Sequence, residues 1–271
     1  MLVRLILLAL AAYVIAVAFM YVFQRQFQYH GGSAPLPTPK EVGVPQMQEV
    51  TTKTEDGLNL QGWFIPPKES DGKIVILFHG NAGNISHRAL KAAHFFEKGY
   101  GVYLAEYRGY GGNPGSPDEE GLYKDARAAV SFVQRKGYEA SQLVFYGESI
   151  GTSVAIEMAR RYQPPLLILE APFTSTVDIA KLGYYWLPVG LLMKDRHDNL
   201  SRIAEVRSSL LIVHGDEDGL IPIALAQKLY ETANHPKEFV TIYGGNHVDL
   251  YDHNAGYIVT EWLDRQVAEG R

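Results

Sequence analysis

Residues 147–151 read Gly-Glu-Ser-Ile-Gly and offer the clearest chemistry in the sequence. They follow the apolar run LVFY and precede SVAIEMARR, which has helical character. A serine between a strand and a helix, with a glycine two residues to either side, is typical of a nucleophile elbow. In that strained turn a glycine is needed wherever a side chain would strike neighbouring backbone. Ser149 is therefore the candidate nucleophile, and a plain turn capped by Ser149 is the alternative.

A serine hydroxyl reacts slowly unaided, so a base and a carboxylate that orients the base should follow it in the chain. Asp218 follows the apolar run SLLIVHG, and His247 follows the run EFVTIY. Each would lie on a loop after a strand, so we expect His247 to act as the base and Asp218 to orient it. His253 is the runner-up for the base, and the neighbouring Asp216 and Glu217 are alternatives for the acid.

The developing oxyanion of such a reaction needs two backbone N–H donors. Ile150, directly after the candidate nucleophile, supplies one. Residues 79–84, HGNAGN, follow the run KIVILF, and the N–H of Asn81 is the expected second donor. A phosphate-binding loop is the rival interpretation, but no Gly-x-x-x-x-Gly-Lys-Ser/Thr pattern is present. Pro114 also breaks a dinucleotide-binding pattern in residues 109–115.

The composition narrows the class of protein further. The chain has 271 residues, a formal net charge of −5 and no cysteine. Without cysteine there is no disulfide framework, thiolate nucleophile or cysteine zinc site. The mild acidic excess argues against nucleic acid as a partner. The scattered histidines lack the spacing of a metal site, so we expect neither a metal nor a cofactor.

Alternating strand-like and helix-like segments should position these residues. Near-continuous Val, Ile and Leu runs separated by helices indicate a parallel sheet with both faces buried. The expected strands of this sheet are 73–79, 101–107, 143–147, 166–169, 210–214 and 239–243. The expected helices are 88–98, 119–135, 150–162, 224–233 and 255–268. Segments 48–54 and 58–65 read as a preceding antiparallel hairpin with a glycine turn. The fold class is therefore α/β, with a mostly parallel central sheet and helices on both faces.

The amino-terminal segment is different in kind. Leu5–Phe23 is a run of 19 uncharged residues, about 28 Å of helix and close to the thickness of a bilayer core. We expect residues 1–25 to be a retained single-pass membrane anchor, with a cleaved signal sequence as the alternative. Charges on its two sides nearly balance, which leaves the side of the catalytic domain open. Residues 26–45, rich in proline and glycine, read as a connector to a domain at 46–271.

An insertion at about 173–206 precedes the strand that carries the candidate acid, where a cap over the sheet edge would lie. It holds the aromatic residues Tyr185 and Trp186. One hypothesis is that they bind the acyl chain of a substrate or rest on the bilayer, and the other is that they pack on the domain below. Arg108 lies between two tyrosines, and we expect it to tie loops together through ion pairs rather than to act on substrate.

Taken together, the sequence resembles the α/β-hydrolase superfamily. More narrowly, it is similar to membrane-anchored α/β-hydrolase-domain serine hydrolases, which include protein depalmitoylases. The motifs that carry this resemblance are at 23–25, 79–84, 107–111, 147–151, 171–175, 214–218 and 245–247. The chain departs from the pattern at Glu106, where aspartate is usual, and at Ser209, where proline is usual. It also lacks the cysteine cluster through which the palmitoyl-removing enzymes bind membranes.

The resemblance implies a triad of Ser149, Asp218 and His247. It also implies hydrolysis of an ester, thioester or amide through an acyl-enzyme. The expected substrate is therefore an acyl ester or thioester, including lipids and acylated proteins. An acyltransferase using the same triad and a non-catalytic membrane scaffold with this fold are the alternatives. The sequence indicates neither the acyl-chain length nor the oligomeric state.

Overall fold

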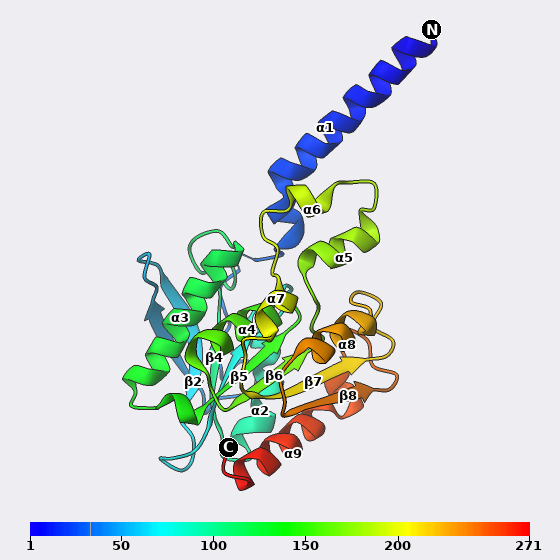
Figure 1. Ribbon diagram of the computed structural model, residues 1–271. Coiled ribbons are helices and arrows are strands. Elements are labelled where there is room, and N and C mark those ends of the chain that lie inside the picture. The colour runs from blue at the N-terminus through cyan, green and yellow to red at the C-terminus, as the bar shows by residue number, and fades with distance from the viewer. Residues whose placement is uncertain (33) are drawn as a thin grey trace.

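The computed structural model describes residues 1–32 and 34–271. Its centre is a sheet whose strands occur in the order β1-β2-β4-β3-β5-β6-β7-β8 (Figure 1). The strands are β1 Gln48–Lys53, β2 Asn59–Ile65, β3 Ile74–Phe78, β4 Gly101–Ala105, β5 Leu143–Glu148, β6 Leu166–Glu170, β7 Ser209–Gly215 and β8 Lys237–Ile242. β2 pairs antiparallel with β1 and with β4, and all the other neighbours pair parallel. The predicted hairpin and mostly parallel sheet are confirmed.

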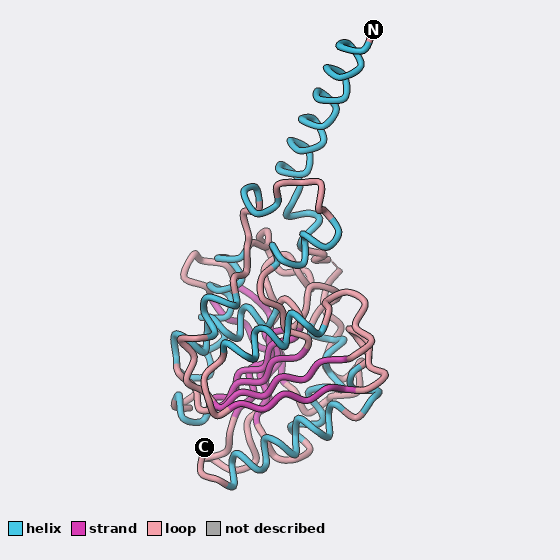
Figure 2. Tube along the Cα trace, turned by 45° about the vertical axis from the view of Figure 1, so that its right-hand side comes forward, coloured by secondary structure: helices cyan, strands magenta, loops and turns pink. Residues whose placement is uncertain are grey.

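Helices lie on both faces of this sheet (Figure 2). They are α2 Ala89–Phe96, α3 Glu119–Arg135, α4 Gly151–Tyr162, α8 Ile223–Thr232 and α9 Ala255–Ala268. Short 3-10 helices occur at Ile85–Arg88, Ala140–Gln142 and Leu250–His253. Every strand and helix predicted for this domain is present, with its ends within two residues of the predicted ones.

Side chains alternate between the two faces of the sheet along each buried strand, so the protein has two hydrophobic cores, one on each face. On β3, Ile74, Ile76 and Phe78 pack with α3, α4 and α8. Val75 and Leu77 point the other way and pack with α2 and α9. Because successive side chains of a strand face opposite sides of the sheet, a strand covered on both faces must be apolar throughout. This explains the uninterrupted apolar runs that revealed the strands in the sequence.

The insertion before β7 forms a small cap of three short helices, α5 Thr176–Gly183, α6 Val189–Leu192 and α7 Asn199–Ile203. Figure 1 shows α5 and α6 above the sheet, beside the lower end of the amino-terminal helix α1, Leu2–Gln28. A small apolar cluster joins the two: Val17 and Met20 of α1 pack against Val177, Leu187 and Val189 of the cap.

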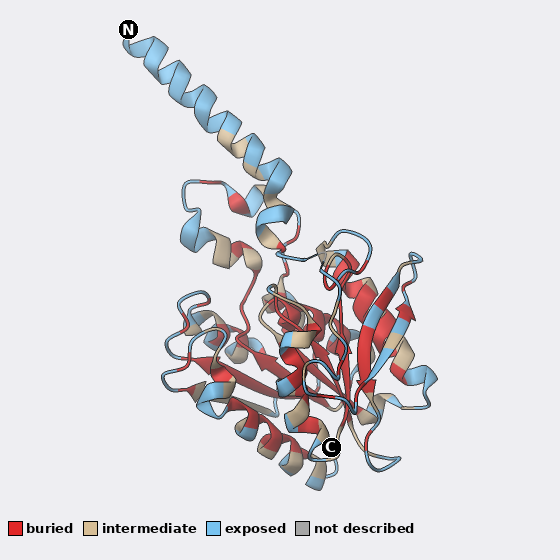
Figure 3. Cartoon of the chain, turned by 180° about the vertical axis from the view of Figure 1, so that it is seen from behind, coloured by how far each residue is buried: buried red, intermediate tan, exposed pale blue. Residues whose placement is uncertain are grey.

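α1 is a single continuous helix, and most of it extends away from the domain with its apolar side chains exposed (Figure 3). Within the described part of the chain, it is the one helix long and apolar enough to cross a membrane. The segment predicted as a connector packs more closely than its composition suggests, since Tyr29 and Val44 are buried. Ser33 of that segment lies outside the described residues.

Candidate active site

Ser149 lies in the turn between β5 and α4 with a φ of +52°, a left-handed conformation that is unusual for serine. Its N–H donates to the carbonyl oxygen of Glu170 at 2.9 Å, which anchors the turn to the neighbouring strand. A β-carbon on Gly147 would lie 2.5 Å from the carbonyl oxygen of Gly151. One on Gly151 would lie 2.1 Å from the carbonyl oxygen of Phe78. Both glycines of the motif are therefore required by close backbone packing.

The three residues proposed as a triad come together although they lie far apart in the chain. His247 Nε2 is 3.0 Å from Ser149 Oγ, and His247 Nδ1 is 2.8 Å from Asp218 Oδ2. The other carboxylate oxygen of Asp218 accepts the N–H groups of Leu220 and Ile221 at 2.9 and 2.8 Å. This geometry allows His247 to take a proton from the serine while the aspartate fixes the ring.

The pKa of Asp218 reflects two opposing effects. Burial raises it, but the hydrogen bonds from His214 and His247 outweigh burial and hold the pKa well below its usual range. Asp218 therefore stays ionised through the acidic range in which free carboxyl groups take up a proton. A carboxylate that keeps its charge can stabilise an imidazolium as it forms.

The alternatives for base and acid lie elsewhere. His253 is exposed in the 3-10 helix Leu250–His253, where its ring lies near Gly244. Asp216 accepts the N–H of Gly244 at 2.7 Å and so joins the loop after β7 to the loop after β8. The side chain of Glu217 is exposed. Of the described residues weighed as base or acid, His247 and Asp218 are the two that join Ser149 in a hydrogen-bonded series.

The proposed oxyanion donors, Asn81 and Ile150, line the same cavity as Ser149. Their backbone N–H groups have no hydrogen-bond acceptor among residues 1–32 and 34–271. The Asn81 side chain holds its loop in place, because Oδ1 accepts the His30 N–H at 2.9 Å and the Tyr110 hydroxyl at 2.8 Å. Unpaired N–H groups beside a nucleophile are the arrangement that an oxyanion hole requires.

Glu106, the departure from the family pattern, supports this loop from below. It is buried, and its carboxylate oxygens lie 2.8 Å from His79 Nε2 and 2.9 Å from the N–H of Ile85. The longer glutamate therefore still reaches both ends of the segment that carries Asn81.

A buried charge cluster beneath the elbow has no counterpart in the sequence-based predictions. Arg88 and Lys91 both contact the carboxylate of Glu148, with Lys91 Nζ at 2.8 Å. Lys91 also contacts Glu170 at 2.6 Å. Burial raises the pKa of Glu148, but Lys91 and Arg88 outweigh it and hold it well below the usual range. Arg88 Nη1 further donates to the carbonyl oxygen of Ala82 at 2.8 Å, which ties the oxyanion loop to the elbow.

The sequence contained one signal of this cluster, the glutamate inside the serine motif. Its partners could not be identified from the sequence, because Arg88 and Lys91 precede it by more than fifty residues.

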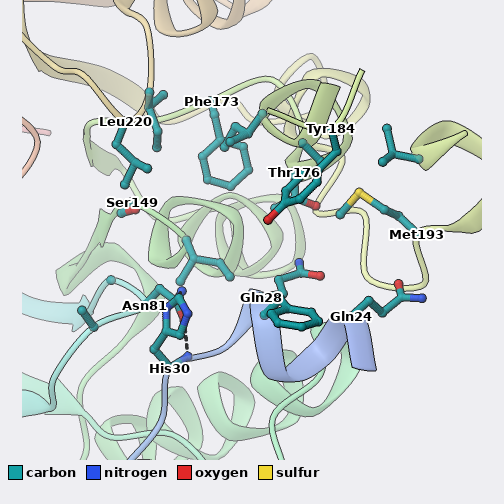
Figure 4. A pocket seen from close by; sticks show the side chains of 18 of the residues that line it. Gln24, Gln28, His30, Asn81, Ser149, Phe173, Thr176, Tyr184, Met193 and Leu220 are labelled. Atoms are coloured by element: carbon teal, nitrogen blue, oxygen red, sulfur yellow. Dashed lines mark hydrogen bonds between the residues drawn. The ribbon is translucent and has the colours of Figure 1, made fainter. Parts of the chain in front are cut away.

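The cavity above Ser149 has a volume of about 490 Å³, within the range of pockets that hold small ligands. Its lining is mostly apolar, and Figure 4 shows Phe173 and Leu220 near Ser149 with Gln24 and Gln28 of α1 across the cavity. The contribution of α1 was not predicted from the sequence. The lining residues from α1 are Met20, Tyr21, Gln24, Phe27 and Gln28.

The positions of Tyr185 and Trp186 differ from those expected of substrate-binding residues. Tyr184 and Leu187, on either side of them, line the cavity, whereas these two do not. α5 ends at Gly183, and the turn that follows directs Tyr185 outward, leaving it 85% exposed. Trp186 lies against α1, where Tyr13 donates to its carbonyl oxygen at 3.1 Å.

Polar contacts fasten the end of α1 to the cap. Arg25 binds the Asp195 carboxylate through two nitrogens at 2.7 and 3.0 Å. Gln24 Nε2 donates to the carbonyl oxygen of Leu192 at 3.2 Å, and Gln28 Nε2 to that of Asp195 at 3.0 Å. The Tyr29 hydroxyl lies 2.9 Å from Nε2 of the buried His197. The last two turns of α1 are therefore part of the folded domain.

Arg108 has the structural role expected from the sequence. It binds Asp125 of α3 and Asp56 of the β1–β2 turn, at 2.8 and 2.9 Å. It is not among the residues that line the cavity.

Comparisons with known proteins agree with this architecture. The family described as "Serine aminopeptidase, S33" matches residues 69–192. An uncharacterized protein of Mycobacterium tuberculosis is 36% identical over 235 residues, which cover 86% of this chain and 83% of that protein. The alpha/beta hydrolase domain-containing protein WAV2 of Arabidopsis thaliana is 28% identical and covers 88% of this chain and 85% of its own.

The solved structure of a Pyrococcus furiosus esterase has the same fold. It superposes with a TM-score of 0.69 at 21% identity, covering 88% of this chain and 100% of its own. The sheet order, the elbow after β5 and these relatives lead to one assignment. The chain belongs to the α/β-hydrolase superfamily.

Proposed function

We propose that this protein is a membrane-anchored serine hydrolase that cleaves a carboxylic ester or thioester. The observation that carries the proposal is the continuous hydrogen-bonded series from Ser149 through His247 to Asp218, at 3.0 and 2.8 Å. It lies beneath an apolar cavity and beside two unpaired backbone N–H groups.

The reaction follows from this arrangement. His247 takes the hydroxyl proton as Ser149 Oγ bonds to the carbonyl carbon, and the N–H groups of Asn81 and Ile150 hold the oxyanion. Collapse breaks the bond to the alcohol or thiol, which leaves with the proton from His247. Water then attacks the acyl-enzyme and gives its proton to His247. Release of the carboxylic acid returns the proton to Ser149.

The charges of the cavity favour an ester over a peptide with a free amino terminus. Among the described residues that line it, Glu148 is the sole carboxylate. Glu148 is already paired with Arg88 and Lys91. An aminopeptidase substrate carries an ammonium group that needs an available acceptor, and burying it unpaired would cost several kcal/mol. An uncharged acyl ester has no such requirement.

The anchoring part of the proposal rests on α1. Its length and apolar surface suit a single membrane crossing. Retention of the helix, rather than cleavage as a signal sequence, is supported by the contacts that Tyr13 and Val17 make with the cap. Cleavage after Ala18 would remove both residues.

Labelling with a fluorophosphonate probe tests the proposal directly. The full-length protein in detergent should be labelled and should hydrolyse nitrophenyl acetate, and Ser149→Ala should abolish both. Ser141→Ala, at an exposed serine remote from the cavity, should change neither. Labelling that survives Ser149→Ala would refute the assignment, and an unreactive wild type would favour a non-catalytic scaffold.

A further inference from the structure

The end of α1 has two roles that are usually separate in an anchored enzyme. The apolar run that would lie in the bilayer continues into the residues that line the cavity: Met20 and Tyr21 belong to both. Phe27 and Gln28, about two turns further on, also line the cavity. The anchor is therefore also a wall of the proposed active site.

The cap presents a second apolar surface beside this helix. Five of its large side chains are exposed, namely Leu182, Tyr184, Tyr185, Trp186 and Leu191, the last being 87% exposed. Trp186 packs edge-on against Tyr13, with ring centroids 6.3 Å apart. Tyr13 lies near the middle of the apolar run and about 15 Å along the helix from Phe23. If α1 spans the bilayer, the tip of the cap at residues 182–191 must enter the bilayer with it.

The cavity opens between these two apolar surfaces. Three aromatic residues line the cavity and are also partly exposed: Tyr21 and Phe27 of α1 and Tyr184 of the cap. These three residues therefore form the rim of the cavity. Below the rim, Ile179, Leu192 and Met193 continue the apolar lining. A mostly apolar surface, in which Gln24 and Gln28 are polar exceptions, thus runs from the membrane-facing side of the protein to the cavity that holds Ser149.

We propose that the substrate is a membrane lipid ester whose acyl chain enters this cavity directly from the bilayer, between α1 and the tip of the cap. The inference rests on the proposed hydrolase function and specifies its substrate class. An acyl chain suits the site because the charged side chains of the lining, Arg88 and Glu148, pair with each other. A chain that passes from lipid to an apolar wall need not cross water, so it avoids the cost of exposing its methylene groups.

A matched pair of substitutions on α1 tests the route of the acyl chain. Met20→Trp narrows the cavity, whereas Val22→Trp adds the same ring to an exposed position outside the lining. The probes are nitrophenyl palmitate and nitrophenyl acetate in mixed micelles with the full-length protein. Met20→Trp should lower the palmitate-to-acetate ratio of kcat/KM by about tenfold or more. Val22→Trp should leave it within about twofold of the wild type.

The outcomes separate this inference from the proposed function. If acetate hydrolysis depends on Ser149 but Met20→Trp leaves the ratio unchanged, the acyl-chain route is refuted and the hydrolase remains. If acetate hydrolysis is independent of Ser149, the proposed function itself fails. Should Met20→Trp not fold, Ala180→Trp narrows the same cavity from the cap and is judged by the same ratio.

Fluorescence provides a second test that does not depend on activity. Of the three tryptophans, Trp63 and Trp262 are 1% and 3% exposed, whereas Trp186 is 45% exposed. In vesicles whose phospholipid acyl chains carry bromine, emission should be quenched in the wild type and much less in Trp186→Phe. Equal quenching of the two proteins would show that the tip of the cap lies outside the hydrocarbon and would overturn the inference.

Discussion

The carboxyl edge of the sheet and the assembly of α1 with the cap are built by different physical means. At the sheet edge, strand ends fix the candidate triad, and each of its residues directly follows or closely follows an apolar run. In the α1–cap assembly, glutamine and arginine side chains bind carbonyl oxygens and one carboxylate of a distant segment. The first arrangement is encoded locally and the second only by the folded backbone, so the second should be easier to loosen without unfolding the protein.

The largest expected effect is on catalysis at the sheet edge. Ser149→Ala should lower kcat for nitrophenyl acetate by at least about 10³-fold, because no other hydroxyl lies within hydrogen-bonding distance of His247 Nε2 in the described chain. Steady-state hydrolysis measures this, with Ser141→Ala as the control. A decrease in kcat of less than about tenfold would contradict the assignment of the catalytic chemistry to the sheet edge.

A smaller effect, on folding, is expected at the second glycine of the motif. Gly151→Ala should lower the free energy of unfolding by about 3 kcal/mol, because its β-carbon would meet backbone oxygens at 2.1 and 2.6 Å. The matched control is Gly183→Ala at the end of α5, where nothing lies within 4 Å. Chemical denaturation in detergent measures both. Equal stability of the two variants would contradict the rigidity assigned to the sheet edge.

The α1–cap assembly should show its own pH dependence through His197. Burial lowers the pKa of this histidine to about 4, whereas the unfolded chain has an ordinary value near 6.5. Well above about pH 6.5 the His197 side chain is neutral in both the folded and the unfolded state. Between that pH and about 4 the unfolded state gains the extra proton, so stability falls as the solution is acidified.

The size of that loss separates His197 from the other titrating groups. Between about pH 6.5 and about pH 4, the free energy of unfolding should fall by about 2 to 3 kcal/mol because of His197. In His197→Gln this component should be absent, and unfolding midpoints measured at several pH values would show a flatter dependence. Parallel curves for the two proteins would show that His197 does not cause the loss of stability on acidification.

The smallest effect is expected for the ion pair that fastens the helix. Asp195 is buried whereas Arg25 is partly exposed, so a double-mutant cycle with Arg25→Met and Asp195→Leu should give a coupling of about 1 kcal/mol. Limited proteolysis between α1 and β1 should become faster in either single variant, whereas Gln26→Ala should behave as wild type. A coupling free energy of zero would mean that the hydrogen bonds of Gln24 and Gln28, rather than this ion pair, hold α1 to the cap.

Most of the sheet edge could be predicted from the sequence because its signals are local. An apolar run predicts a buried strand, and a glycine-flanked serine between strand and helix predicts the elbow. The positions of Asp218 and His247 then follow from the strands that precede them. Of the two histidines predicted as candidate bases, His247 lies 3.0 Å from Ser149 Oγ, whereas His253 lies near Gly244.

The α1–cap assembly could not be predicted in this way. Gln24 and Gln28 bind backbone carbonyl oxygens, which every residue carries, so no residue type marks the partner. The sequence suggested Tyr185 and Trp186 as substrate-binding residues because both are aromatic. In the structure their neighbours Tyr184 and Leu187 line the cavity instead. In a short irregular cap no periodicity decides which side chain faces inward, and the place where α5 ends decides it instead.

The continuity of α1 has a mechanical consequence. From Leu2 to Gln28 it contains no glycine or proline that would let it bend, and its last two turns are fastened to the cap. A spanning helix tilts when its apolar length exceeds the thickness of the hydrocarbon layer. Any such tilt would be transmitted to the wall of the cavity, so the width of the acyl-chain route would vary with bilayer thickness. On the proposed anchoring and substrate, the lipid composition of the membrane would then affect turnover as well as supply the substrate.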